Sequence, residues 1–287
     1  MISSISVLLK LESINMYNFT LGCDPELFLF DHERSKFISA IGKIGGSKKE
    51  PLKINDIISL QEDNVLVEFN ITPAESRGAW NDFVNSGLFE VNATASRLNL
   101  GSIICSSAVL DEDQFYDEKA LEFGCDPDFN IYTNTINPKP KHENPYFRSA
   151  GGHVHFGVPF KEGNKKFTLP HMIRWCDIII GTWGKLIEPN SKRSELYGKA
   201  GCFRPKPYGF EYRTPSNFWL KSPALINEMY SKALYCVNIC SAVGSPQEVG
   251  ITDKEVRTVI DSSESTIENI MSLYQKLTGI GGYESPI

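Results

Sequence analysis

Four short stretches of the sequence alternate apolar residues with residues that can bind a metal ion or a phosphate. They are residues 22–26, 66–70, 152–156 and 210–213. Successive side chains of a strand point to opposite faces, so His153 and His155 share a face, as do Glu211 and Arg213. A strand that merely faces water usually shows Thr, Lys, Ser and Gln. The Glu, His and Arg found here predict a cupped sheet whose polar face is an active site.

Carboxylates in the first two stretches are candidate metal ligands. Glu68 lies in an otherwise apolar strand, where it is either a metal ligand or a solvated edge position. Glu26 has the same two interpretations, while Asp63 is a weaker candidate that a turn would also explain. Carboxylates together with one or two histidines suit Mg²⁺ or Mn²⁺, because both ions prefer oxygen ligands and Mn²⁺ also accepts imidazole.

The histidine pair has a functional and a trivial interpretation. His153 and His155 can bind one metal ion or bracket a phosphate, although an isolated pair of this kind is more often without function. Two glycines, Gly151 and Gly152, precede the pair. Consecutive glycines at the start of a strand let another chain or a ligand approach the backbone closely, which favours a functional site.

The fourth stretch lies next to a group of basic residues. Alone, Glu211 and Arg213 could be a cross-strand ion pair on a wet face, which would contribute little to stability. The preceding loop adds four cationic side chains: Arg193, Lys199, Arg204 and Lys206. This local positive charge in an acidic protein favours an anion, and a phosphate is the natural one.

A glycine-rich segment at residues 42–49 invites comparison with a phosphate-binding loop. It does not fit the GxxxxGK[ST] pattern, and no helical pattern follows it directly. We therefore interpret Lys48 and Lys49 as solvent-exposed side chains in preference to a flexible cover over the site.

Length, charge and cysteine content argue against several classes of function. The chain has 287 residues and a formal net charge of -6, so nucleic-acid binding through a basic patch is not expected. Seven scattered cysteines without a CxxC pair indicate a reducing, cytoplasmic compartment. No run of residues approaches the roughly 20 apolar residues of a membrane span, so no membrane association is expected.

The hydrophobic pattern predicts strands that carry these residues and helices that cover them. The expected strands are residues 19–30 paired with 36–41, then 64–71, 102–110, 129–132, 150–159 and 208–214. The expected helices are residues 78–100, 168–187 and 222–243, followed by two that begin at the capping boxes of Thr252 with Glu255 and Ser265 with Glu268. Residues 191–207 are expected to form a loop.

This order of elements favours an α+β fold: a curved, mostly antiparallel sheet with helices packed on one face. We expect one catalytic domain over residues 1–287. The sequence leaves open whether residues 1–16 are an N-terminal extension.

Taken together, the motifs resemble those of the phage-type carboxylate–amine ligases (COOH.NH2 ligase type 2, amidoligases) of the glutamine synthetase and glutamate–cysteine ligase superfamily. The resemblance runs in order from about residue 19 to about residue 245. It is carried by residues 22–26, 63–70, 150–157, 197–201 and 211–219. It implies a glutamine synthetase-like catalytic domain and ATP-dependent amide formation, in which a substrate carboxylate becomes an acyl phosphate that an amine then attacks.

The resemblance also implies residue roles. The implied ligands of two or three Mg²⁺ ions, with Mn²⁺ as a substitute, are Glu26, Glu68, His153 and Glu211. Arg213 and Arg204 would neutralise the transferring phosphate beside Glu211. The implied nucleotide-binding residues are His155, Lys199, Arg193, Arg204 and Arg213, and for His155 a place in the second shell of a metal is the alternative.

Two other functions stay open. A metal-dependent hydrolase would use the same acids and histidines to activate water, and it would need neither ATP nor the arginines. A non-catalytic phage module would leave the four polar strands scattered over the surface. For a ligase, the partners would be small-molecule or peptide carboxylates and amines, whose identity the sequence does not reveal, and a homo-oligomer is compatible with the chain.

Overall fold

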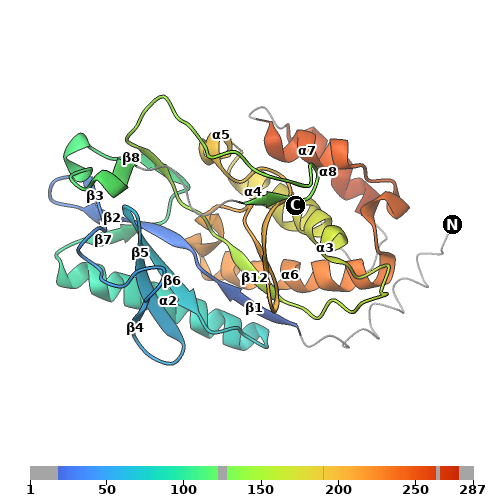
Figure 1. The fold of residues 1–287 in the computed structure, drawn as a ribbon, viewed down its shortest axis with the longest axis horizontal. Helices are drawn as coiled ribbons and strands as arrows, with labels where there is room; N and C mark the ends of the chain where they lie inside the picture. The colour runs from blue at the N-terminus through green and yellow to red at the C-terminus, as the bar shows by residue number, and fades with distance from the viewer. Residues whose placement is uncertain (1–18, 122–127, 190, 263–265, 278–287) are drawn as a thin grey trace.

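The computed structural model describes residues 19–121, 128–189, 191–262 and 266–277. The expected N-terminal extension, residues 1–16, lies outside the described residues. Figure 1 shows an elongated molecule in which one sheet and helix α2 occupy one half, while another sheet and the later helices occupy the other half.

Two six-stranded sheets form the framework. The first sheet has the order β1-β12-β14-β13-β9-β10, with β1 Thr20–Cys23, β12 Val154–Gly157, β14 Gly209–Tyr212, β13 Cys202–Lys206, β9 Phe129–Asn130 and β10 Thr135–Ile136. The second has the order β3-β2-β6-β5-β4, with β3 Lys36–Ile38, β2 Glu26–Asp31, β6 Leu66–Ile71, β5 Ile58–Asp63 and β4 Leu52–Lys53, and β7 Gly101–Ile103 also pairs with β2. A small third sheet pairs β8 Ser107–Val109 with β11 Phe147–Ser149.

Every strand pair within the described residues is antiparallel. The α+β class with a mostly antiparallel sheet is therefore confirmed, and the structure adds that the strands are divided between separate sheets. The helices and helical turns are α2 Arg77–Arg97, η1 Glu112–Gln114, η2 Glu118–Leu121, α3 Leu169–Cys176, η3 Asp177–Gly181, α4 Thr182–Ile187, α5 Arg193–Leu196, η4 Asn217–Lys221, α6 Pro223–Val243, η5 Pro246–Val249, α7 Asp253–Asp261 and α8 Ile267–Leu277.

The two large sheets meet at Asp24 and Pro25, a link that we call the seam. The strand expected over residues 19–30 is interrupted here, because β1 pairs with β12 whereas β2 pairs with β6. Proline has no N–H to donate to a ladder, so a break at Pro25 is physically reasonable. The residues on either side stay tied to the first sheet, since Glu26 N donates to the carbonyl oxygen of Gly151 over 2.9 Å. The seam therefore places Asp24 and Glu26 beside the segment that leads to the two histidines.

Helices cover the apolar faces of both sheets. In the second sheet Phe69 packs against α2 so closely that a Cβ on Gly87 would lie 2.4 Å from its ring. In the first sheet Tyr212 points inward, and its hydroxyl donates to Asp177 over 2.7 Å. Because side chains alternate along a strand, Glu68 and Glu211 face the opposite side.

The long helices begin at residues whose side chains cap them. Ser76, Thr168 and Ser222 cap α2, α3 and α6 through their side chains. The capping box of Thr252 and Glu255 begins α7. Ser265, the expected cap of the last helix, lies outside the described residues, and Thr266 Oγ1 accepts from Asn269 N over 3.3 Å.

Two further expectations about individual elements are wrong, and one strand was not expected. Residues 191–207, expected as a loop, contain α5 and β13, because β13 folds back on β14 in a hairpin whose pairing overrides its basic composition. The single strand expected over residues 102–110 is two short strands in different sheets, β7 and β8. Strand β5 was not expected, because Gln61, Glu62 and Asp63 obscure its alternating pattern.

The described cysteines are all free, and Cys125 lies outside the described part. None of the helices in the described ranges combines the length and the apolar character that a bilayer span requires.

Candidate active site

Three carboxylates of the second sheet converge on one point. Glu26 on β2, Asp63 at the end of β5 and Glu68 on β6 have oxygen atoms that all lie within 4.8 Å of one another. The register of the sheet produces this meeting, because Glu26 and Glu68 are directly opposite across β2 and β6. We call these three residues the first carboxylate group.

Glu26 and Glu68 of the first carboxylate group are buried, and Asp63 is half-buried. Burial, followed by the charge of Asp63, raises the pKa of Glu26 to about 8. Burial and the charges of Asp24 and Asp63 also raise the pKa of Glu68 well above its usual value. Gln61 Nε2 donates to Glu68 over 2.7 Å, and Gly151 N donates to Glu26 over 2.7 Å. Like charges held together without water favour either protonation or a bound cation.

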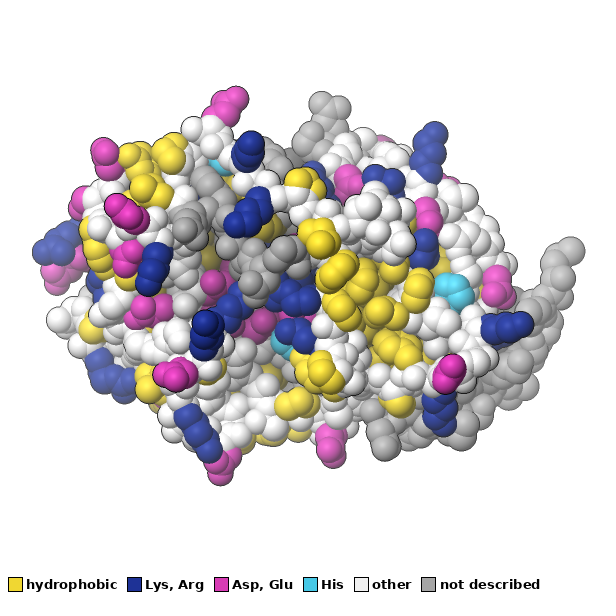
Figure 2. Space-filling view, in the orientation of Figure 1, with side chains coloured by type: hydrophobic (Ala, Val, Ile, Leu, Met, Phe, Trp, Pro, Cys, Tyr) yellow, Lys and Arg dark blue, Asp and Glu magenta, His cyan; other side chains and the backbone are white. Residues whose placement is uncertain are grey.

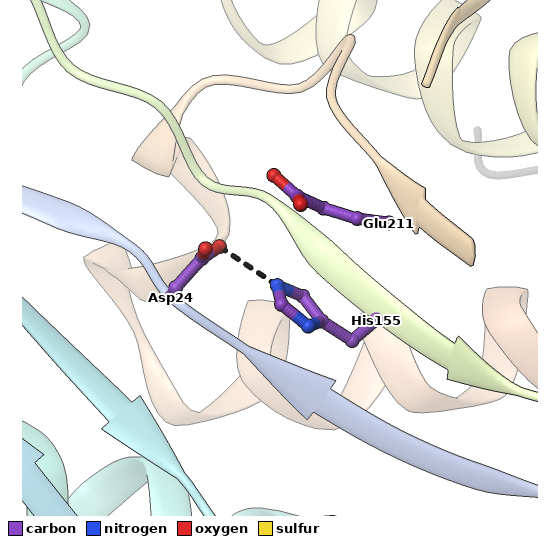
Figure 3. Close-up of side chains that lie close together, drawn as sticks. All are labelled: Asp24, His155 and Glu211. Atoms are coloured by element: carbon purple, nitrogen blue, oxygen red, sulfur yellow. Dashed lines mark ion pairs between the residues drawn. The ribbon is translucent and has the colours of Figure 1, made fainter. Parts of the chain in front are cut away.

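A second group of ligand atoms lies on the first sheet. Asp24 at the seam, His155 on β12 and Glu211 on β14 also have ligand atoms within 4.8 Å of one another, and Figure 3 shows the three side chains converging from neighbouring strands. Asp24 Oδ1 lies 3.1 Å from His155 Nε2 and 3.5 Å from His153 Nδ1. Burial alone would lower the pKa of His155, but the Asp24 carboxylate outweighs it and raises that pKa. We call Asp24, His155 and Glu211 the second group.

Glu211 is the centre of a buried ion-pair network. Its carboxylate lies 3.0 Å from Lys206 Nζ and 3.3 Å from Arg204 Nη1, and it also contacts Arg213 Nη1. Burial and the charge of Asp24 act to raise the pKa of Glu211, but Arg213 and the two histidines lower it to about 2. The side chain is fully buried, so the interpretation as an ion pair on a wet face is wrong.

His153 lies between the network and the carboxylates. It is 4% exposed, and its Nδ1 is 3.2 Å from Arg213 Nη1 and 3.8 Å from Glu211. Burial and the Arg213 charge lower its pKa, so the imidazole is neutral at physiological pH. A neutral imidazole can accept a hydrogen bond or bind a cation.

A cavity of about 70 Å³ opens beside Glu26 and Asp63 of the first carboxylate group. Its charged lining residues include Glu26, Asp63, His153, Arg193 and Arg213. Figure 2 shows acidic, basic and histidine side chains gathered in a hollow near the centre of this face. The four metal ligands expected from the sequence are thus divided: Glu26 and Glu68 lie in the first carboxylate group, Glu211 lies in the second group, and His153 borders the second.

The residues expected to bind nucleotide occupy different surroundings. Arg193 is buried and donates to the carbonyl oxygens of Thr214 over 2.8 Å and Arg213 over 3.3 Å. Lys199 accepts from Thr214 Oγ1 through its carbonyl oxygen, and its charge lowers the pKa of the buried Lys185 after burial itself. Arg193 therefore lines the cavity, whereas Lys199 is not among the residues that line it.

Lys48 and Lys49, expected as solvent-exposed, are both exposed. The positive charge of Lys48 nevertheless acts on Glu68 and lowers its pKa against the larger effect of burial. The glycine-rich segment therefore passes near the first carboxylate group.

Two residues of the site were missed from the sequence. Asp128, just before β9, lies 2.5 Å from Arg213 Nε and 3.8 Å from Arg204 Nη2. Tyr208, between β13 and β14, has its hydroxyl 2.8 Å from His155 Nδ1. Asp128 lies just before the expected strand 129–132, and Tyr208 begins the expected strand 208–214 but lies outside its alternating motif at residues 210–213. No local pattern therefore marked either of them as a site residue. Asp24 and Asp63, which the sequence left undecided, both lie among the candidate ligands.

Comparison with known proteins finds that part of this chain is similar to a family. Residues 143–249 match the family described as Phage phiEco32-like COOH.NH2 ligase-type 2, so the resemblance predicted from the sequence is confirmed over that segment. The segment contains the histidines of β12, the basic strand β13 and Glu211 on β14, and it supports a ligase. No curated protein matches the sequence.

Three solved structures are similar at low sequence identity. Apo GmaS without ligand aligns with a TM-score of 0.48 and 13% identity over 97% of this chain and 68% of that one. A GmaS/ADP complex aligns with a TM-score of 0.42 and 13% identity over 97% and 69%. A glutamine synthase homolog aligns with a TM-score of 0.43 and 10% identity over 96% and 67%.

Proposed function

We propose that this chain is an ATP-dependent carboxylate–amine ligase that forms an amide or peptide-like bond through an acyl phosphate. One observation carries the proposal: Glu26 and Asp63 of the first carboxylate group line one cavity with Arg193 and Arg213, and Arg213 also contacts Glu211 of the second group. The family match over residues 143–249 supports the same class of enzyme. The substrates would be a small-molecule or peptide carboxylate and an amine.

The residues present fit divalent cations. The first carboxylate group offers three carboxylates, two of them buried with raised pKa values, which suits the oxygen preference of Mg²⁺. The second group adds the imidazole of His155 to two carboxylates, a set that Mn²⁺ also tolerates. Bound there, the ions would screen phosphate charge and polarise the substrate carboxylate. His153 would support the second group from its border.

The cationic side chains would act on the phosphoryl group. Phosphoryl transfer depends on positioning and charge neutralisation more than on covalent chemistry by the protein. Arg213 and Arg204 both contact Glu211, and they would also donate hydrogen bonds to the equatorial oxygens of the transferring phosphoryl group. Each preorganised donor of this kind stabilises a transition state by about 3 kcal/mol. No nucleophilic side chain is required by such a mechanism.

Arg193 and Lys199 stay predictions as nucleotide-binding residues. The hydrogen bonds of Arg193 to the carbonyl oxygens of residues 213 and 214 favour a role in holding the end of β14, and with it the backbone of Arg213. Cytoplasmic location and a possible homo-oligomer likewise stay predictions.

ADP release and product formation test the proposal together. The full chain is incubated with ATP, Mg²⁺ and a mixed pool of carboxylates and amines, and a mass-spectrometric screen looks for a new amide. We expect ADP and an amide in equal amounts, both abolished by Glu68→Gln. Asp82→Asn, which removes an exposed carboxylate on α2, is the matched control and should retain full turnover.

The other outcomes separate the alternatives. Hydrolysis of a substrate with metal but without ATP would establish the hydrolase instead. If Glu68→Gln released ADP at the full rate, the predicted role of Glu68 in the site would be wrong.

A further inference from the structure

We propose that Tyr208 is a positioning residue that holds the imidazole of His155 with Nε2 directed at Asp24 and Glu211. The inference rests on the proposed function, because it concerns the second group as a cation site. Tyr208 and its interaction were not marked by any sequence motif.

Each ring nitrogen of His155 has its own partner. The Tyr208 hydroxyl lies 2.8 Å from His155 Nδ1, while Nε2 lies 3.1 Å from Asp24 Oδ1. The two aromatic rings also stack, with centroids 6.3 Å apart and an angle of 17° between their planes. The imidazole is therefore held by a hydrogen bond at one nitrogen, with the phenol ring close to parallel to it.

This arrangement decides which nitrogen can serve a cation. A histidine that binds a metal ion through one nitrogen usually donates a hydrogen bond from the other, and that bond sets the tautomer and the orientation of the ring. A phenol oxygen can accept this hydrogen bond.

The backbone at Tyr208 is fixed against β12, which limits where its hydroxyl can lie. Its carbonyl oxygen accepts from Val158 N over 3.0 Å, which ties the β13–β14 turn to the end of β12. The next residue, Gly209, has φ of +150°, and a Cβ there would lie 2.1 Å from the carbonyl oxygen of Phe156. The turn can approach β12 this closely only with glycine at that position.

The other histidine has a different partner. His153 Nδ1 faces Arg213, which can only donate. Tyr208 therefore acts on His155 alone among the two imidazoles. Tyr208 is 48% exposed, so packing in the core does not explain the choice of tyrosine.

Replacement of the hydroxyl alone tests the inference. Tyr208→Phe keeps the ring and its stacking and removes only the hydrogen bond to His155. We measure Mn²⁺ binding by electron paramagnetic resonance and by calorimetry, together with the melting temperature in EDTA. We expect an unchanged melting temperature in EDTA and a Kd for Mn²⁺ raised about 10- to 100-fold at the weakened site.

Tyr116→Phe is the matched control. Tyr116 is 61% exposed, and its hydroxyl donates to the carbonyl oxygen of Ile41 over 2.6 Å, remote from the second group. Its Mn²⁺ affinity should equal that of the wild type.

The outcomes distinguish this inference from the proposed function. If the wild type binds Mn²⁺ and Tyr208→Phe binds it equally well, the positioning role is refuted and the ligase proposal stands. If the wild type binds no Mn²⁺, the cation sites of the proposed function fail, and the inference fails with them.

Discussion

Glu26 shows how one side chain can be costly to the fold and useful to the site. It is 5% exposed and shares its surroundings with Asp63 and Glu68. A carboxylate in such a place resists ionisation, because neither water nor a paired cation compensates for the charge. A bound divalent cation would remove that penalty, so the same residue would favour the occupied protein over the empty one.

The pH dependence of stability provides the test at the residue scale. Below about pH 4.5, the ordinary pKa of Glu26, both the folded and the unfolded chain hold the proton. Between that pH and the folded pKa of about 8 only the folded chain holds it, so this residue lowers the stability as the pH rises, by up to about 1.4 kcal/mol per pH unit.

We therefore expect Glu26→Gln in EDTA to match the wild type near pH 4.5 and to be more stable by on the order of 4 kcal/mol near pH 7.5. Urea unfolding at the two pH values measures the difference. A wild type whose stability relative to the Gln variant does not change with pH would contradict the raised pKa.

At the scale of elements, the approach of η4 to the segment before β12 holds the histidines in place. Gly152 N donates to the carbonyl oxygen of Pro215 over 3.0 Å, and Trp219 Nε1 donates to the carbonyl oxygen of Gly152 over 3.0 Å. The sequence predicted that two consecutive glycines would admit a close approach, and the neighbour is another part of the chain. The same segment leads directly into His153 and His155.

Gly152→Ala tests this packing. The added Cβ would lie 2.2 Å from the carbonyl oxygen of Ser216, so backbone must move. We expect a loss of about 1–3 kcal/mol in the free energy of unfolding together with weaker Mn²⁺ binding, measured by thermal unfolding with and without the ion.

Gly78→Ala is the control for Gly152→Ala. It lies on α2, and its nearest neighbour would be 4.0 Å away. A helical Ala in open space should stabilise the chain by up to about 1 kcal/mol. If Gly152→Ala and Gly78→Ala changed the free energy of unfolding equally, the close approach of Gly152 to Ser216 would not contribute to stability.

At the scale of the whole molecule, each large sheet carries one group of candidate ligands. The first carboxylate group belongs to β2, β5 and β6, while the second group belongs to β12, β14 and the seam. Asp24 and Glu26 flank Pro25, so the two groups are joined by one short link. Binding at either group would therefore stabilise the junction between the sheets.

Metal titration tests this arrangement. A ligand that binds only the folded state raises the free energy of unfolding by about 2.7 kcal/mol at a concentration 100 times its Kd. We expect Mn²⁺ to raise the melting temperature, EDTA to reverse the effect, and NaCl of equal ionic strength to have none. Calorimetry should find binding at both groups, with Glu68→Gln and Asp24→Asn each removing one of them. If NaCl raised the melting temperature as much as Mn²⁺ does, the effect would be charge screening and not binding at the two groups.

Local pattern was sufficient for much of the fold and for part of the site. Alternation along single strands placed Glu68, Glu211 and the two histidines on polar faces, because side-chain direction in a strand depends only on neighbouring residues. Helix caps such as Ser222 and Thr252 act within one turn, so they too could be identified from the sequence alone. Strand β13 was hidden because its pairing with β14, and not its basic composition, makes it a strand.

The grouping of ligands required the folded chain. Which residues meet depends on register between strands far apart in sequence: Glu26 opposite Glu68, and His155 opposite Glu211. A register shift of one residue would turn those side chains to the other face, and no local pattern specifies the register. Asp128 and Tyr208 reach the site from loop and turn positions, where proximity arises only after the sheets are assembled.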